Sequence, residues 1–201
     1  MLHNRCVEIG KNFNIPIVVK STFEEMSAGT VVKHEKKLED LNISGIAKED
    51  NVSKITLLGL DNKVGETYKL FKLLSDNSIN VDIIVQSHDE YTSKDVSFSV
   101  KTTDLERTLE LLNKHLDEVK FKGILNSKNL AKISLVGIGI SNTVGVSTRM
   151  FEALCKKNIM MHMISTSEIK ISVLVDQEQA NEAMKAIHRE LIETNRRESY
   201  V

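Results

Sequence analysis

An internal repeat constrains the fold of this chain more than any other feature of its sequence. The segment KITLLG at residues 54–59 returns as KISLVG at residues 132–137, and both copies continue through a glycine turn, an amphipathic helix and a strand. Gly65 and Gly145 mark the matching turns, and the second copy carries two extra residues before its glycine. A repeat of this length, with its own helix and strand periods, is typical of a small domain rather than of a solenoid unit. We therefore expect two related small domains.

The composition indicates an ordinary globular protein. Hydrophobic residues make up 41% of the 201 residues, enough for one or two modest cores, since a domain takes about 100 to 150 residues. The formal net charge of -1 gives no global field that would favour nucleic acid or an anionic membrane as a partner. No apolar run approaches the roughly 18 residues of a spanning helix, and the N-terminal residues lack a secretion signal. Cys6 and Cys155 are expected to be free thiols, so the expected location is the cytoplasm.

The first repeat, residues 52–125, predicts the order strand, helix, strand, strand, helix, strand. Alternating apolar residues at 79–85 predict its second strand. Thr103 and Glu106 have the spacing of a capping box and predict the start of its second helix. The expected core positions of that helix are Leu105, Leu109, Leu112 and Leu116.

The second repeat follows the same order but lacks a last strand. After its second helix only a polar tail, residues 194–201, remains, whereas an unassigned strand-like segment, residues 42–48, precedes the first repeat. A sheet with a strand missing leaves an unsatisfied edge, so we expect residues 42–48 to complete the second unit. The predicted domains are then residues 52–125, and residues 42–48 with 130–193, after an arm of residues 1–40.

A β-α-β-β-α-β order gives the ferredoxin-like fold of the α+β class, with two helices on one face of an antiparallel sheet. The arm of residues 1–40 shows a short helix, a strand-like run and a loop, with too little apolar surface to fold alone. We interpret it as the α/β end of a larger domain or as a segment packed on a partner. The ferredoxin-like fold hosts many functions, so it does not by itself assign one.

Several segments of the chain resemble the paired ACT domains of aspartokinases. The most specific is STSEIKISVLV at residues 165–175. The resemblance covers nearly the whole chain, since residues 2–8 and 18–23 look like the last part of the kinase domain. The other segments that carry it are ISGIA at residues 43–47, NVDIIVQ at residues 80–86 and AKISLVG at residues 131–137.

The resemblance implies the regulatory end of an enzyme that transfers the γ-phosphoryl group of ATP to the side chain of aspartate. The catalytic motifs of the family and the GxxxxGK[ST] pattern have no counterpart in this sequence, so we expect no phosphoryl transfer by this chain alone. No cofactor is expected here, because ATP and Mg would belong to the kinase domain. The implied partners are that kinase domain or a separate catalytic subunit, and a second copy paired through the ACT sheets.

A bound amino acid makes demands that the first repeat can meet. Its carboxylate needs N–H donors, which a helix beginning at Gly65 presents with the positive end of its dipole. Its ammonium needs a carboxylate, which Asp61 at the turn or Asp82 on the next strand can supply, although both residue types are also common in turns and on solvated surfaces. In the resembling family the inhibitor lies between this turn and this strand, at an interface between ACT domains. The predicted effector site is Asp61, Val64, Gly65, Glu66, Thr67, Asn80, Asp82, Gln86 and Ser87.

The matching positions of the second repeat predict a weaker site. Its strand shows Met160, His162 and Ile164 on the outward face, so the carboxylate of the first repeat is lost. We therefore expect a packing surface there and regard the first repeat as the sensor. The counterpart residues are Ser141, Val144, Gly145, Met160, Met161, Thr166 and Ser167.

Lysine is the favoured effector, because its second ammonium can pair with one of several local acids. Threonine, or both amino acids acting together, is the alternative. A second class of function also stays open, namely a freestanding ACT-type sensor or dimerisation module for another partner. The kinase-like arm favours the aspartokinase interpretation. RNA binding is disfavoured by the 4% aromatic content, and the six histidines lack the spacing of a metal site. The local acids that could pair with the second ammonium of lysine are Asp61, Glu66, Asp82, Asp89 and Glu90.

Overall fold

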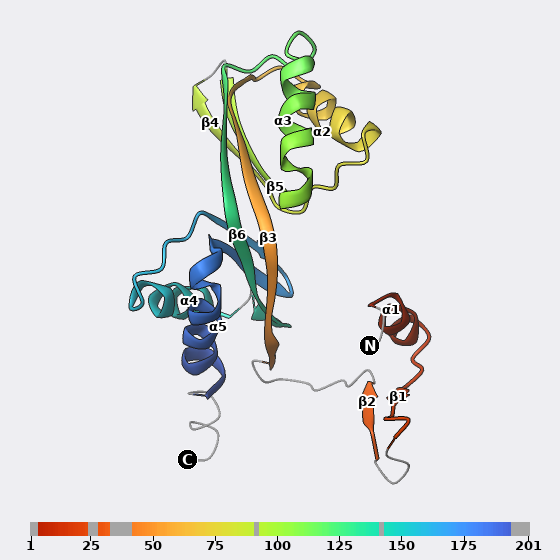
Figure 1. Ribbon diagram of the computed structural model, residues 1–201. Helices are drawn as coiled ribbons and strands as arrows, with labels where there is room; N and C mark the ends of the chain where they lie inside the picture. Colours follow the sequence, from red (N-terminus) through yellow and green to blue (C-terminus); the bar gives the residue numbers. More distant parts are fainter. Residues whose placement is uncertain (1–3, 24–27, 33–41, 91–92, 141–142, 194–201) are drawn as a thin grey trace. The chain divides into compact units, whose positions relative to one another are not determined.

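The chain divides into two compact units, residues 1–40 and residues 41–201, which are considered separately. A computed structural model (Figure 1) describes residues 4–23, 28–32, 42–90, 93–140 and 143–193.

The described residues of the first unit form one helix and a two-stranded antiparallel sheet. Helix α1 spans Asn4–Asn12, strand β1 spans Ile17–Val19 and strand β2 spans Thr30–Val32, with β1 and β2 paired. The helix and the first strand agree with the sequence prediction, whereas β2 falls in a segment predicted as a loop. Phe13 and Phe23 are exposed, so this unit presents apolar side chains at its surface.

The second unit is built on two long antiparallel strands, β3 (Asn42–Asp61) and β6 (Gly123–Ile138). They lie at the centre of a six-stranded antiparallel sheet of order β4-β5-β3-β6-β8-β7. The sequence predicted separate strands in each repeat, but β3 and β6 each run through both. The strands change register near Asn51 and Asn129, whose φ angles of 60° and 56° lie in the left-handed region that asparagine tolerates.

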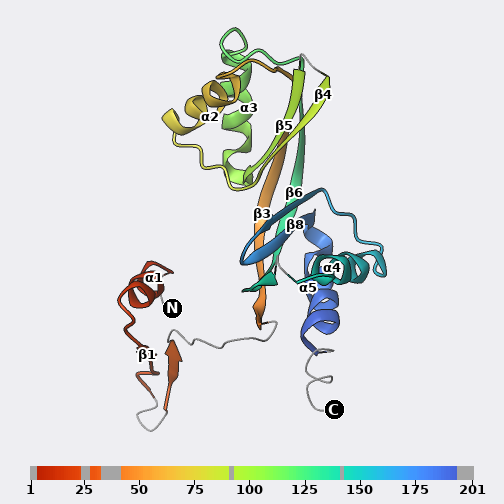
Figure 2. The ribbon, with the colours of Figure 1, turned by 180° about the vertical axis from the view of Figure 1, so that it is seen from behind.

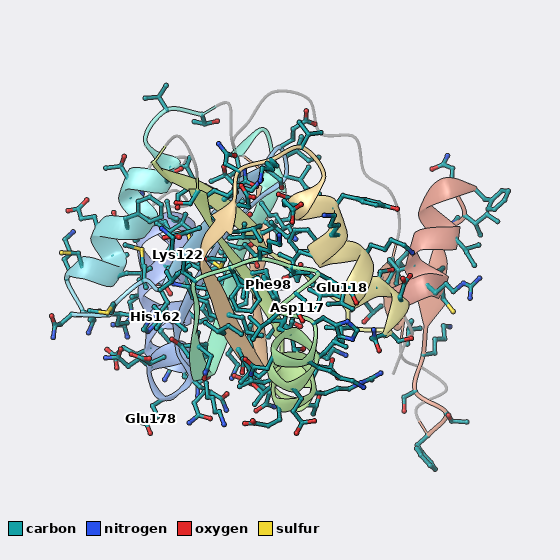
Figure 3. All side chains as sticks on the ribbon, turned by 90° about the horizontal axis from the view of Figure 1, so that it is seen from above. Phe98, Asp117, Glu118, Lys122, His162 and Glu178 are labelled. Atoms are coloured by element: carbon teal, nitrogen blue, oxygen red, sulfur yellow. The ribbon has the colours of Figure 1, made fainter. Side chains whose placement is uncertain are left out.

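The remaining elements of this unit cover the sheet with two pairs of helices. Figures 1 and 3 show α2 and α3 on one side of the β3–β6 pair and α4 and α5 on the other, and Figure 2 shows β8 beside β6. None of the described helices is long and apolar enough to cross a membrane. The bounds are α2 (Glu66–Asp76), β4 (Ile84–Glu90), β5 (Ser93–Lys101), the 3-10 turn η1 (Thr102–Asp104), α3 (Leu105–Lys114), α4 (Val146–Cys155), β7 (Met163–Ser167), β8 (Lys170–Asp176), the 3-10 turn η3 (Gln177–Gln179), α5 (Ala180–His188) and the π-helical turn η4 (Arg189–Glu193).

Each repeat forms a ferredoxin-like half of this sheet. The first half has the order β6-β3-β5-β4 and the second has the order β3-β6-β8-β7. In the second half, Ile43 and Ile46 of β3 stand opposite Gly137 and Leu135 of β6, which pairs with β8 on its other side. Residues 42–48 therefore occupy the strand position that the second repeat lacks, as the sequence predicted. The fold class, two ferredoxin-like units in an α+β chain, is confirmed.

Each half has its own hydrophobic core. In the first half, Phe98, labelled in Figure 3, is fully buried. Its ring meets that of Phe71 edge to face, with centroids 5.9 Å apart. The second half has a separate core beneath α4 and α5. The fully buried members of that second core include Ile133, Leu135, Met150, Leu154, Val173 and Ile187.

Two local predictions for the second helix of the first repeat are wrong. Helix α3 begins at Leu105 after a 3-10 turn, and the cap residue Asp104 makes no side-chain capping bond, so the predicted box of Thr103 and Glu106 does not form. Leu116 is exposed beyond the end of α3, although Leu105 is buried as predicted. A heptad pattern predicts which face of a helix is apolar, but it does not fix where the helix ends.

Candidate functional site

Gly65 sets the turn that leads into α2. Its φ angle is 96°, in the left-handed region that residues with a Cβ rarely adopt. Apart from its chain neighbours, no heavy atom lies within 4 Å of the position of an added Cβ, so glycine is needed for backbone conformation and not for space. The N–H of Lys69 donates to the carbonyl of Gly65 at 2.9 Å. The preceding N–H groups, those of Thr67 and Tyr68, therefore have no acceptor within the helix and can bind an anion.

Replacing Gly65 by Ala should destabilise the chain by about 1 to 2 kcal/mol, because alanine must adopt a left-handed backbone. Gly45 provides the matched control, since its φ lies outside that region and the space around it is also open. Urea unfolding of both variants measures the difference. Equal losses of stability would contradict a conformational requirement at Gly65.

The start of α2 lies against the edge strand β4. The hydroxyl of Thr67 donates to the side-chain carbonyl of Gln86 at 3.1 Å, which joins the two elements. Ser87 follows Gln86 on β4, and because successive strand residues face opposite sides, it points away from Thr67. Val64 is fully exposed at the turn. The structure thus brings together four predicted site residues, which we call the turn–edge cluster: Val64, Gly65, Thr67 and Gln86.

Asp61 and Glu66 line a pocket of about 570 Å³ between α2 and the segment that follows α3. Lys63 Nζ lies 2.8 Å from Asp61 Oδ2, and this hydrogen bond lowers the pKa of the Asp61 carboxyl. The buried Glu66 contacts Lys69 Nζ at 2.7 Å through Oε1, while its Oε2 has no hydrogen-bond partner among the described residues. Both carboxylates are therefore already paired with nearby lysines. The other lining residues are Lys72, Leu73, Asp76, Asp117, Glu118 and Lys120.

Asp82 lies where the first repeat meets the second. Its N–H donates to the carbonyl of Ser99 at 3.2 Å. Its Oδ2 accepts a hydrogen bond from Lys132 Nζ at 2.5 Å, and the same Nζ is 2.5 Å from Glu49 Oε2. Partial burial opposes the charge of Lys132, but the hydrogen bonds to Asp82 and Glu49 outweigh it and raise the pKa of the ammonium.

Strand β5 shows that Asp61 and Asp82 are far apart. Asp61 stands opposite Ser93, whereas Asp82 bonds to Ser99. Six residues of strand separate these partners, or about 20 Å at about 3.3 Å per residue. One ammonium cannot contact both carboxylates, so the chain does not bring together the two acids predicted to bind it. Asn80 is exposed, and its side chain makes no hydrogen bond with the described residues.

Comparisons with known proteins match this architecture. The ACT domain family matches residues 55–116 and 133–191, one match in each repeat. The chain is 39% identical over 189 residues to aspartokinase 2 of Bacillus subtilis (strain 168) and 38% identical over 190 residues to an aspartokinase of Bacillus sp. (strain MGA3). The ligand-free regulatory subunit of aspartate kinase from Thermus thermophilus has a similar structure, with a TM-score of 0.68 and 31% identity over 74% of this chain and 98% of that one. The chain belongs to the aspartokinase family, as a regulatory region with two ACT domains.

This aspartokinase regulatory region corresponds to only part of the curated proteins. The two Bacillus matches cover 94% of this chain but 46% of each relative, so the chain spans about half their length. By contrast, it spans nearly all of the Thermus thermophilus regulatory subunit.

The second ACT domain repeats the turn of the first but not its charge. Gly145 has a φ angle of 93°, close to that of Gly65, and Val144 is fully exposed like Val64. His162 occupies the position that matches Asp82, and its Nε2 lies 2.9 Å from Asp176 Oδ1. Of the other predicted counterparts, Met161 packs against the second core, Met160, Thr166 and Ser167 are exposed, and Ser141 lies outside the described residues.

The sequence prediction missed the polar contacts between the two ACT domains. Lys132 of the second domain bonds to Asp82 of the first, and Lys54 of the first donates to the carbonyl of His162 in the second at 3.2 Å. Lys54 and Lys132 begin the repeated segments, and Asp82 and His162 occupy matching positions, so the two contacts are related by the repeat. The repeat itself was thus the signal that could have found them. Between them lies an apolar cluster, here called the junction cluster, of Val52, Ile83, Leu130, Met163 and Leu174.

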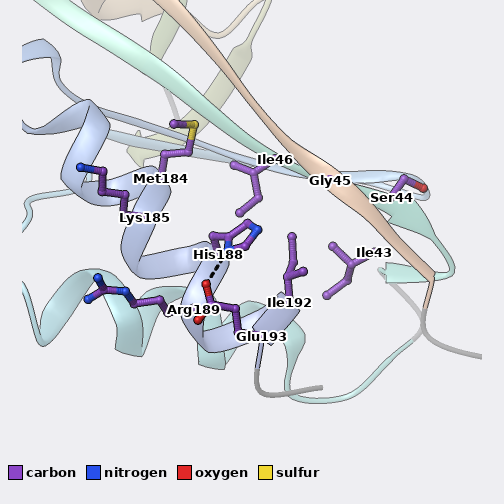
Figure 4. Close-up of a pocket in the computed structure, with 10 residues that line it drawn as sticks. All are labelled: Ile43, Ser44, Gly45, Ile46, Met184, Lys185, His188, Arg189, Ile192 and Glu193. Atoms are coloured by element: carbon purple, nitrogen blue, oxygen red, sulfur yellow. Dashed lines mark hydrogen bonds and ion pairs between the residues drawn. The ribbon is translucent and has the colours of Figure 1, made fainter. Parts of the chain in front are cut away.

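A second pocket, of about 600 Å³, lies between the start of β3 and the end of α5 (Figure 4). His188 Nδ1 and Glu193 Oε1 are 3.2 Å apart at its wall. None of the predicted effector residues lines it. Among the described residues, no group of three or more His, Cys, Asp or Glu side chains could hold a metal ion. The remaining lining residues are Ile43, Ser44, Gly45, Ile46, Met184, Lys185, Arg189 and Ile192.

Proposed function

We propose that this regulatory region mediates feedback inhibition by lysine of the ATP-dependent phosphorylation of aspartate, with the first ACT domain as the sensor. The observation that carries the proposal is the difference between the two domains at matching positions. The first has Asp82 on the segment leading to β4, whereas the second has His162, which is paired with Asp176. Only the first domain therefore has a carboxylate at this position, and Asp82 is 42% exposed although it is paired with Lys132.

The distance between the start of α2 and Asp82 suits an extended amino acid with two ammonium groups. The free N–H groups at the start of α2, next to the Thr67–Gln86 contact, suit the effector carboxylate. Asp82 lies four residues before Gln86, about 13 Å along an extended segment. A ligand that contacts both places must be long and must carry a cation at its far end. Lysine has such a side chain, while threonine lacks the second cation, so lysine is preferred and threonine remains the runner-up.

Inhibition then follows from coupled equilibria. If lysine binds better to the inhibited arrangement, it shifts the enzyme toward that arrangement by its difference in affinity, typically about 1 to 3 kcal/mol. The first unit is suited to transmit the change, because its exposed Phe13 and Phe23 provide an apolar surface for a kinase domain to cover. This surface favours the aspartokinase role over a freestanding sensor for another partner.

The expected partners are a kinase domain or catalytic subunit and a second copy of the chain. Strands β4 and β7 end the sheet, and Ile84 and Ile164 on them are exposed, so both edges can pair with another ACT domain. Sedimentation analysis should therefore give a homodimer. We propose no cofactor for this region, since ATP and Mg would be bound by the kinase domain, and the cytoplasm as its location.

Calorimetric titration of the 201-residue chain with lysine, threonine and methionine tests the effector assignment. Saturable heat with lysine and little or none with the other two is the expected result. Saturable heat with threonine and none with lysine would replace lysine by threonine. The absence of binding by any amino acid derived from aspartate would reject the sensor role.

A further inference from the structure

We propose that the side-chain ammonium of Lys132 competes with the effector for Asp82, so that effector binding at the first ACT domain releases a contact with the second. This inference rests on the proposed function, because it concerns the same site. It adds a residue from the other ACT domain to the control of that site.

The contact between Lys132 and Asp82 uses the same chemical groups as binding of free lysine would. Lys132 presents a primary ammonium on a four-carbon stem, as free lysine does, and its Nζ is hydrogen-bonded to Asp82 Oδ2. The Lys132 side chain is only 12% exposed, whereas Asp82 is 42% exposed. The carboxylate is therefore open to a ligand from solvent while its internal partner is held in place. Two ammonium groups at one carboxylate repel each other, so each cation weakens the binding of the other.

Glu49 gives the displaced ammonium another partner. Glu49 stands opposite Lys132 in the β3–β6 pair, and its Oε2 already contacts Lys132 Nζ. When an effector binds Asp82, Lys132 keeps its bond to Glu49 within the second half of the sheet. The bond that is lost is the one that crosses to the first domain. The exchange therefore leaves no buried charge unpaired.

The release weakens one side of the junction between the two domains. The matching contact, from Lys54 to the carbonyl of His162, and the junction cluster are not part of the exchange. The effector affinity is then reduced by the fraction of molecules in which Lys132 occupies Asp82. The same exchange links the occupancy of the site to the contact between the domains.

Two lysine variants test the competition by calorimetric titration of the full chain with lysine. Lys132→Met should bind lysine roughly three- to tenfold more tightly, because the competing cation is gone. Lys54→Met is the matched control, since Lys54 is the repeat counterpart of Lys132 and donates to a backbone carbonyl instead of a carboxylate. It should bind lysine as the unmodified chain does. Unchanged or weaker binding by Lys132→Met would overturn the inference.

A third variant should act in the opposite direction. Glu49→Gln removes the alternative partner of Lys132, so the ammonium stays with Asp82 and lysine binding should weaken by about two- to fivefold. A purely structural role of Lys132 does not predict opposite effects of these two changes. Glu49→Gln also tests the inference if Lys132→Met fails to fold, and unchanged or tighter binding by it would count against the competition.

The outcomes separate the inference from the proposed function. If the unmodified chain binds lysine but the variants do not shift its affinity as described, only the internal competition fails. If neither the unmodified chain nor Lys132→Met binds lysine or threonine, the sensor role fails, and the competition fails with it.

Discussion

Replacing Asp82 by Asn should lower the affinity of the chain for lysine by about tenfold or more. A hydrogen bond to a charged group is worth about 1.5 to 3 kcal/mol, and asparagine keeps the shape of the side chain while removing its charge. Threonine, if it binds at all, should lose less, because it has no second ammonium to place there. Calorimetric titration with both amino acids measures the two losses.

Asp76 provides the control for this substitution. It is an exposed aspartate paired with Lys72 at 2.8 Å along α2, and it lies outside the turn–edge cluster. Asp76→Asn should leave lysine binding unchanged. Asp76→Asn should retain nearly the full stability of the chain, since ion pairs between exposed groups contribute about 0 to 1 kcal/mol. Asp82→Asn should also stay folded, because the partly buried Lys132 keeps its ion pair with Glu49. Undiminished lysine binding by Asp82→Asn would place the effector ammonium elsewhere, and the charged pocket around Glu66 would be the next candidate.

The largest loss of stability is expected from Phe98→Ala. Phe98 is fully buried at the centre of the first ACT domain, opposite Ile55 on one side and Ile84 on the other. Removing a buried phenylalanine ring costs about 3 to 5 kcal/mol, and the lost edge-to-face contact with Phe71 contributes part of that cost. This is a large share of the roughly 5 to 15 kcal/mol that stabilises an ordinary domain.

Denaturant unfolding with Phe23→Ala as the control tests this expectation. Phe23 is almost fully exposed, so the same truncation there should change the free energy of unfolding by no more than about 0.5 kcal/mol. Because β3 and β6 run through both ACT domains, the loss from Phe98→Ala should also appear in amide exchange of the second domain. A loss below about 1 kcal/mol, or one confined to the first domain, would show that the domains are less tightly packed or less cooperative than the structure indicates.

Much of the fold could be predicted from the sequence. The internal repeat and the spacing of apolar residues together indicate the order of helices and strands in each half. The unpaired edge of the second repeat correctly indicated residues 42–48 as its missing strand. The continuity of β3 and β6 could not be read in the same way. It depends on Asn51 and Asn129, which allow each strand to change register and continue, whereas asparagine in a sequence usually suggests a turn.

The candidate site was less predictable, since side-chain partners depend on the tertiary structure. The turn at Gly65 and its closeness to Gln86 were expected and are observed. The separation of Asp61 from Asp82 was not expected. Both residues belong to the first repeat, but they lie near opposite ends of β5, and the sequence does not show this distance. Lys132 is distant from the site in sequence, and only the match between Lys54 and Lys132 within the repeat pointed toward it.

The position of residues 42–48 has a consequence for synthesis on the ribosome. These residues emerge before the whole first ACT domain, but their pairing partners are residues 133–138. At about 5 to 20 residues per second, the partner strand follows roughly 5 to 18 s later. During that interval the nascent chain can complete the inserted domain while the start of β3 exposes unsatisfied backbone groups to other chains. Shielding of this short segment during that interval would then reduce pairing of the nascent chain with other chains.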